Sequence, residues 1–117
     1  MSSRLVALDL YLRLREKPRL ARERSVAAAR ARMERVTRLV PLPRGLAIAD
    51  ATLGGRPAVR IAPPPRGGLL LWLHGGAYCL GSRRTHVPLV AALAMRAGLG
   101  AALPDYRLAP EHPFPAA

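Results

Sequence analysis

The stretch best suited to chemistry is a histidine followed by two glycines at positions 74–76, which directly follow an apolar run at residues 69–73. Glycine has no Cβ atom, so the backbone there can turn sharply and leave its N–H groups open to a ligand. In open α/β sheets, ligands bind outside the carboxyl ends of the strands. The pattern therefore predicts a buried strand that ends in an anion-binding turn at the edge of an active site.

A second segment strengthens this interpretation. It runs from Asp105 to Ala117 and reads Asp-Tyr-Arg-Leu-Ala-Pro-Glu-His-Pro-Phe-Pro-Ala-Ala. The turn His74-Gly75-Gly76-Ala77 resembles the HGGG-type oxyanion motif of esterases and lipases with the α/β-hydrolase fold. The later segment is similar to the one that follows strand 4 in the hormone-sensitive-lipase-like branch of that family. The resemblance covers residues 45–117 closely and the N-terminal part more loosely.

The resemblance implies an α/β fold, namely a partial α/β-hydrolase sheet of about four strands preceded by cap-type helices. We expect residues 1–44 to form the helical, cap-like region and residues 45–117 to form the incomplete N-terminal portion of the hydrolase domain. The implied function is a carboxylic ester hydrolase that works through a serine acyl-enzyme, acts on a small-molecule ester and uses no cofactor. An ordinary docking role for the helices is an equally good alternative to a cap.

The resemblance also assigns roles in the turn, residue by residue. Gly76 and Ala77 match the backbone N–H donors of an oxyanion hole, and Gly75 shapes the turn. Ala77 departs from the third glycine of the motif, but its N–H remains available. His74 supports the loop by hydrogen bonding, and Tyr78 either lines a substrate pocket or simply packs. A tight turn after a strand is the structural alternative for the whole motif.

The catalytic triad is missing from this sequence. None of the serines, which are Ser2, Ser3, Ser25 and Ser82, lies in a G-x-S-x-G elbow. Ser82 has Leu80 and Arg84 where the glycines would be. The sequence therefore predicts the N-terminal part of a longer esterase, with the oxyanion-hole segment but without the nucleophile and its partners.

Other reactive side chains are poor catalytic candidates. We do not expect His74, His86 or His112 to act as a base, because no carboxylate clusters around them, and no metal site is indicated for the same reason. Cys79 is expected to be a small core or loop residue. The Asp105-Tyr106-Arg107 segment could orient the active-site loops through an ion pair, a role that we expect to be architectural rather than catalytic.

The net charge of +12 is concentrated at the front of the chain, where residues 1–44 hold 12 basic and 4 acidic side chains. An alternative function is therefore a non-catalytic fragment whose basic helices bind an acidic partner. No aromatic residues alternate with these arginines, so we favour a solvated surface and expect no nucleic-acid binding. No apolar run approaches the ~20 residues of a membrane span. We see no signal peptide and expect a cytoplasmic protein.

Periodicity predicts helices over residues 3–15 and 20–40, hairpin strands at 46–52 and 57–62, a strand at 69–73, a helix over 85–97 and a strand at 100–104. Pro18 is expected to end the first helix or to start the next turn. The buried stripe of the second helix is expected to be Val26, Ala29, Met33, Val36 and Val40. Pro63–Pro65 would form a stiff connection into the strand at 69–73. That strand is expected to be covered on both faces, and to become an exposed apolar edge if no elbow strand pairs with it.

Overall fold

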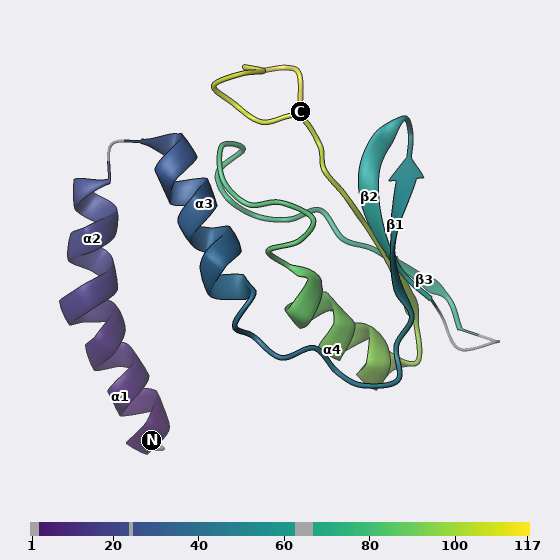
Figure 1. Cartoon of the computed structure of the whole chain (residues 1–117), viewed down its shortest axis with the longest axis horizontal. Helices are drawn as coiled ribbons and strands as arrows, with labels where there is room; N and C mark the ends of the chain where they lie inside the picture. Colours follow the sequence, from purple (N-terminus) through teal and green to yellow (C-terminus); the bar gives the residue numbers. More distant parts are fainter. Residues whose placement is uncertain (1–2, 24, 63–66) are drawn as a thin grey trace.

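The computed structural model describes residues 3–23, 25–62 and 67–117, and the predicted connection at Pro63–Pro65 lies outside them. Four strands form one sheet in the order β1-β2-β4-β3. Helix α4 packs on this sheet, and the N-terminal helices lie beside it rather than over it (Figure 1). The molecule measures 45 × 41 × 20 Å.

The predicted hairpin is present. β1 (Ile48–Leu53) pairs antiparallel with β2 (Arg56–Ile61). The two strands are joined by Gly54 and Gly55, which have φ angles of 56° and 73°. Two successive positive φ values are what a tight two-residue hairpin turn requires, and glycine adopts them without a steric penalty.

The predicted β-α-β unit is also present. β3 (Leu69–Leu71) is followed by α4 (Val87–Ala97) and β4 (Gly100–Pro104), and β3 and β4 run parallel. The left-handed Gly98, with φ 66°, ends α4, and Pro88 lies in its first turn. Both positions suit these residues, because proline needs no N–H donor there and glycine accepts a positive φ.

The core lies between α4 and one face of the sheet. Its buried members come from β2, β4 and α4 and are Val59, Ile61, Val87, Val90, Ala91, Ala94, Ala101 and Leu103. Small side chains on α4 let that helix approach β2 and β4 closely. Met95, near the C-terminal end of the same helix, is 44% exposed and lies outside this core.

Strand β3 is an edge strand, and the expectation that it is covered on both faces is wrong here. Leu70 and Trp72 pack against the core. Leu69, Leu71 and Leu73 point to the other side and are 62%, 55% and 64% exposed. Successive side chains of a strand point to opposite faces, and α4 covers only one of them. The exposed apolar edge expected in the absence of an elbow strand is therefore observed.

The first helical segment is longer than predicted. Its consecutive parts are α1 (Ser3–Tyr11), η1 (Leu12–Glu16) and α2 (Lys17–Arg22). Pro18 lies inside it and does not end it. The wider π-helical turn η1 ends at Glu16, two residues before the proline, and such a turn relieves the clash of the proline ring with the preceding turn. No helix among the described residues is long and apolar enough to cross a membrane.

Helix α3 (Val26–Thr37) is shorter than the predicted helix over 20–40. Ser25 begins it, because its Oγ accepts a hydrogen bond from the Ala28 N–H at 3.2 Å. The predicted stripe is not a buried face, since Val36 and Val40 are exposed and no residue of α3 is buried. The predicted boundary between residues 44 and 45 falls between α3 and β1, and this division into two regions stays a prediction.

Candidate active site

The chain makes an unusual turn just after β3. Gly76, Ala77 and Tyr78 have φ angles of 134°, 52° and 58°, so three successive residues adopt positive values. At Gly76 a Cβ atom would lie 2.1 Å from the carbonyl oxygen of Leu80, whereas at Gly75 it would meet nothing within 4 Å. The steric requirement for glycine therefore falls on Gly76. For Ala77 and Tyr78, this conformation costs on the order of 1–3 kcal/mol each.

Backbone hydrogen bonds hold this strained turn. The Gly76 carbonyl accepts from the N–H groups of Cys79 at 3.1 Å and of Leu80 at 2.8 Å. The Tyr78 carbonyl accepts from the Ala109 N–H at 2.8 Å, which ties the turn to the C-terminal segment. A strained backbone persists only where its surroundings fix it, and these bonds do so here.

The amides of Gly76 and Ala77 have no hydrogen-bond acceptor among the residues that the structure describes. They adjoin a cleft of about 600 Å³ that lies at the carboxyl end of β3. The cleft is lined by Leu73, His74, Gly75, Gly76, Ala77, Tyr78, Tyr106 and Ala117. The structure thus brings all five predicted site residues, 74–78, into the wall of one cleft.

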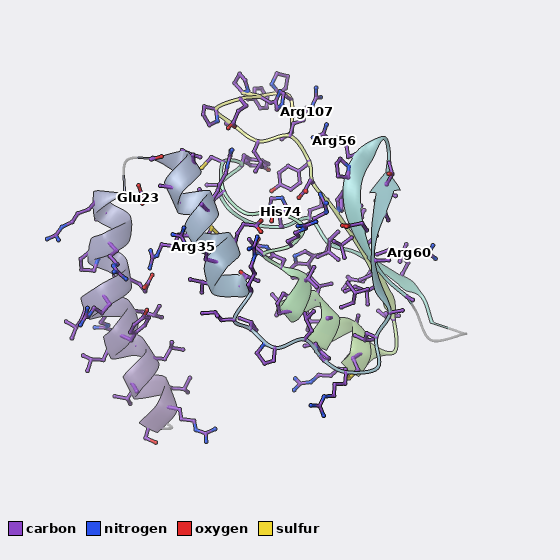
Figure 2. The ribbon with its side chains drawn as sticks, in the orientation of Figure 1. Glu23, Arg35, Arg56, Arg60, His74 and Arg107 are labelled. Carbon is purple, nitrogen blue, oxygen red and sulfur yellow. The ribbon has the colours of Figure 1, made fainter. Side chains whose placement is uncertain are left out.

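His74 is buried, with 3% of its surface exposed, and supports the turn from inside (Figure 2). Its Nδ1–H donates to the Gly75 carbonyl at 3.1 Å. Its ring stacks on Tyr106, with 4.4 Å between the ring centroids, and the Tyr106 hydroxyl donates to the His74 carbonyl. Gly81 packs directly against His74. Only glycine fits at position 81, because a Cβ atom there would lie 2.7 Å from His74 Nδ1.

His86 extends this aromatic stack. Its ring centroid lies 5.8 Å from that of His74, with a tilt of 29°. Burial, and then the neighbouring His74, lower the pKa of His86, although a backbone hydrogen bond to Ser82 opposes the shift. Burial and the nearby Tyr78 raise the pKa of Tyr106, which keeps its hydroxyl protonated as a donor. The stack is therefore neutral near pH 7 at these two groups and suits a structural role.

Asp105 forms its ion pair with Arg83 rather than with Arg107. Its carboxylate accepts from the Arg83 N–H and from Arg83 Nη1, both at 2.5 Å. Arg83 also donates to Asp50 at 3.3 Å. Burial disfavours the charge on Arg83, but its hydrogen bonds to the carboxylates of Asp105 and Asp50, together with their negative charge, outweigh burial and raise the pKa of Arg83. The pair joins the loop before α4 to the end of β4.

Ser82 and Ser25 are occupied by structural contacts. The Ser82 hydroxyl donates to Glu34, and its Oγ accepts from the Thr85 N–H at 3.3 Å. Ser25 caps α3. Neither serine has a histidine as a hydrogen-bond partner among the described residues, in agreement with the absence of an elbow motif around them.

A smaller apolar hollow adjoins the cleft on the side of Tyr78. It has a volume of about 330 Å³ and shares Tyr78 and Ala117 with the cleft. Its other lining residues are Ala109, His112, Phe114 and Pro115. The edge of Tyr78 faces Tyr106, with 6.3 Å between the ring centroids, so one aromatic wall runs from the turn into this hollow.

Comparison with known proteins points to the same family that the two motifs resemble. Residues 70–117 match the family described as alpha/beta hydrolase fold. The crystal structure of a hormone-sensitive lipase from a metagenome library covers 100% of this chain, at 35% identity and a TM-score of 0.83. Over these residues the chain is similar to the hormone-sensitive-lipase-like α/β-hydrolases. It corresponds to an N-terminal part of their fold, as the two sequence motifs predict.

Curated relatives point the same way. The carboxylic ester hydrolase LipN of Mycobacterium tuberculosis is 37% identical over 84% of this chain. An acetyl-hydrolase of Streptomyces hygroscopicus is 45% identical over 56% of it. The chain spans 28% and 22% of the length of these two relatives, and 39% of the metagenomic lipase.

Sequence reasoning missed three residues that shape the site. Gly81 packs under His74, Tyr106 holds the turn by stacking and hydrogen bonding, and Arg30 reaches the loops from α3. The segment containing Tyr106 was noticed, but only for an ion pair. Nothing local to Gly81 or Arg30 signals these roles, because both depend on contacts with segments elsewhere in the fold.

Proposed function

We propose that this chain supplies the oxyanion-binding turn of a carboxylic ester hydrolase that acts on small-molecule esters. The observation that carries the proposal is the pair of adjacent amides, Gly76 and Ala77, which have no acceptor among the described residues and adjoin the cleft. A turn held in a strained conformation with open donors is preorganised for a developing negative charge. The names of the relatives, which are hydrolases of esters or acetyl groups, support the same reaction class.

In the proposed reaction, a serine hydroxyl attacks the ester carbonyl and the carbonyl oxygen becomes an anion. The N–H groups of Gly76 and Ala77 donate to this oxygen, the alcohol leaves, and water then releases the acid from the acyl-enzyme. The proposal assigns the serine, histidine and aspartate to sequence beyond these residues, because no G-x-S-x-G occurs here. One oxyanion donor typically contributes about 10²–10³ in rate.

The neighbouring residues have supporting roles in this proposal. His74 and Tyr106 fix the orientation of the turn through their stacking and through the hydroxyl bond to the His74 carbonyl. Tyr78 forms the wall of the substrate pocket, continuous with the apolar hollow around Phe114. An apolar wall beside the oxyanion site suits a substrate with an uncharged acyl or alcohol group.

The first test is the intact mass of the protein as its source makes it, followed by hydrolysis of p-nitrophenyl acetate and butyrate. We expect a mass well above 12.6 kDa and measurable hydrolysis. Gly76→Ala, whose Cβ would clash with Leu80, should lower kcat by about 10²-fold or more. Ala77→Gly keeps the N–H and should retain activity. A protein of 12.6 kDa without hydrolysis, or full activity in a folded Gly76→Ala variant, would contradict the proposal.

Two further predictions from the sequence are kept as proposals. We place the protein in the cytoplasm, which cell fractionation tests.

Binding of an acidic partner by the basic helices remains the alternative function, and it would appear as phosphate-polymer binding with a steep salt dependence. Part of that positive charge is engaged within the chain, since Arg13, Arg30 and Arg32 form ion pairs with carboxylates.

A further inference from the structure

Arg30 projects from α3 into the gap between two loops. Its Nε donates to the Cys79 carbonyl at 2.8 Å, and its Nη2 donates to the Ala109 carbonyl at 2.7 Å. These carbonyls are 49 and 79 residues away in sequence. One guanidinium group therefore bridges the turn after β3 and the C-terminal segment.

The same guanidinium also binds Glu111 with two hydrogen bonds. Nη1 donates to Oε1 at 2.7 Å, and Nη2 donates to Oε2 at 3.0 Å. This fork geometry is specific to arginine and fixes the orientation of the group. The side chain of Arg30 is 26% exposed, so its bonds to the two carbonyls are only partly screened by water.

The two carbonyls flank the hydrogen bonds that hold the strained turn. Cys79, which accepts from Arg30, donates its own N–H to Gly76. Ala109, the other acceptor, donates its N–H to Tyr78. Arg30 thus holds, from outside, the two residues whose amides fix the conformation of residues 76–78.

We propose that Arg30 is a positioning residue that keeps the Gly76 and Ala77 amides aligned by clamping Cys79 and Ala109 together. This inference rests on the proposed function, because the value of aligned amides lies in ester hydrolysis. It also assigns a task to the N-terminal region: α3 fixes the turn through a polar clamp, without a buried apolar face. The hydrogen bond between Glu34 and Ser82, one helical turn further along α3, holds the other end of the same loop.

The role requires arginine rather than any cation. A lysine ammonium at position 30 is a point charge and cannot reproduce the planar fork that meets two carbonyls and a carboxylate together. Glu111 neutralises the charge, and the bond from Arg30 in turn lowers the pKa of Glu111. The clamp is therefore intact at neutral pH and loses its carboxylate when Glu111 is protonated in acid.

The first arm of the test measures hydrogen exchange and needs no catalysis. In Arg30→Ala we expect the amides of Cys79, Leu80 and Ala109 to exchange about 10- to 100-fold faster, as expected for loss of charge-assisted hydrogen bonds. Arg30→Lys should restore part of the protection. Arg35→Ala, an exposed arginine on the same helix, is the matched control and should change nothing.

A second variant keeps the test informative if Arg30→Ala fails to fold. Glu111→Gln removes the carboxylate partner but leaves both bonds to the carbonyls, so it should speed exchange modestly, and mainly around Ala109. Unchanged exchange at Cys79, Leu80 and Ala109 in a folded Arg30→Ala protein would overturn the proposal.

The second arm measures ester hydrolysis by the protein as its source makes it. Misaligned amides should lower kcat of Arg30→Ala about 10- to 100-fold and leave KM nearly unchanged, because the lost interaction belongs to the transition state. Faster exchange with an unchanged kcat would overturn the positioning role. If the wild-type protein hydrolyses no ester, the proposed function fails, while the exchange arm still decides whether Arg30 holds the turn.

Discussion

The sheet with α4 and the N-terminal helices are held in place by different forces. The core between α4, β2 and β4 is built from buried aliphatic side chains. No residue of α1, η1 or α3 is buried, and these helices are joined to each other and to the loops by side-chain hydrogen bonds and ion pairs. Residues from Leu5 to Leu14 include seven large apolar side chains that are at least 43% exposed.

This difference separates stability from alignment. Burial of apolar surface is non-directional and stabilises the β-α-β unit that carries the turn. The polar contacts of α3 are directional, and they meet the loop after β3 at Cys79 and Ser82. The core therefore determines whether the domain folds, and α3 determines how the turn is oriented.

The largest expected effect comes from a cavity in the core. Leu103→Ala, at a fully buried position of β4, should lower the free energy of unfolding by about 2–5 kcal/mol. Leu8→Ala, at a position of α1 that is 51% exposed, should change it by less than about 0.5 kcal/mol. Urea denaturation of both variants makes the comparison, and equal losses would contradict the division into a buried and an exposed region.

Sequence patterns predicted the buried region well because its elements carry complete local signals. The glycines at 54 and 55 locate the hairpin, and Pro88 and Gly98 mark the two ends of α4. The strand at 100–104 is found with the predicted limits. The N-terminal helices were predicted less accurately, because Pro18 is accommodated within the helical segment and no residue of α3 is buried.

The position of the candidate site could be predicted from the sequence, but the long-range contacts that hold its turn could not. A histidine and two glycines after an apolar run place the turn, and a second motif names the family. Periodicity cannot reveal that Tyr106 stacks on His74 or that Arg30 binds Ala109, since these contacts join segments 32 and 79 residues apart. Which face of β3 is left open could not be inferred from its own residues, because they are apolar on both sides.

The next effect concerns the ion pair that links the loop before α4 to β4. Asp105→Ala removes the acceptor of the Arg83 backbone N–H and of its guanidinium, and leaves a partly buried arginine with only Asp50. We expect a loss of about 1–3 kcal/mol in the free energy of unfolding. Thermal or urea unfolding measures it. Arg107→Ala, whose exposed side chain donates to the Ala116 carbonyl, is the control and should have little effect.

Protonation of His86, in the aromatic stack beside His74, should make the free energy of unfolding depend on pH. The pKa of His86 is lowered from its usual 6.5 by burial and by His74, so the unfolded chain binds a proton at a higher pH than the folded one. The contribution of His86 to stability is thus present above about pH 6.5 and is lost as the pH falls toward the folded-state pKa. In His86→Phe this part of the pH dependence should disappear. Identical pH profiles for wild type and variant would exclude the effect.

The open edge of the sheet should control self-association of the 117-residue chain. Leu71 is 55% exposed on β3, which is an edge strand, and an apolar edge is a template for pairing with another strand. We expect the chain to associate and Leu71→Lys to reduce this without destabilising the core. Thr52→Lys, on the opposite edge strand β1, is the control. Sedimentation velocity measures the oligomeric state of each variant, and a monomeric wild-type chain would contradict the predicted self-association.

The smallest effect on global stability should come from acid acting on the N-terminal helices. The pKa of Glu16 is lowered by hydrogen bonds from Tyr11 and then Arg32, and that of Glu111 is lowered by Arg30. Both contributions are present above the unfolded value of 4.5 and are lost as the pH falls through the lower folded-state values. Amides of α3 should therefore exchange faster below about pH 4.5, when corrected for intrinsic rates, while those of α4 and β4 stay protected. Parallel loss of protection in both regions would show that the helices and the core unfold as one unit.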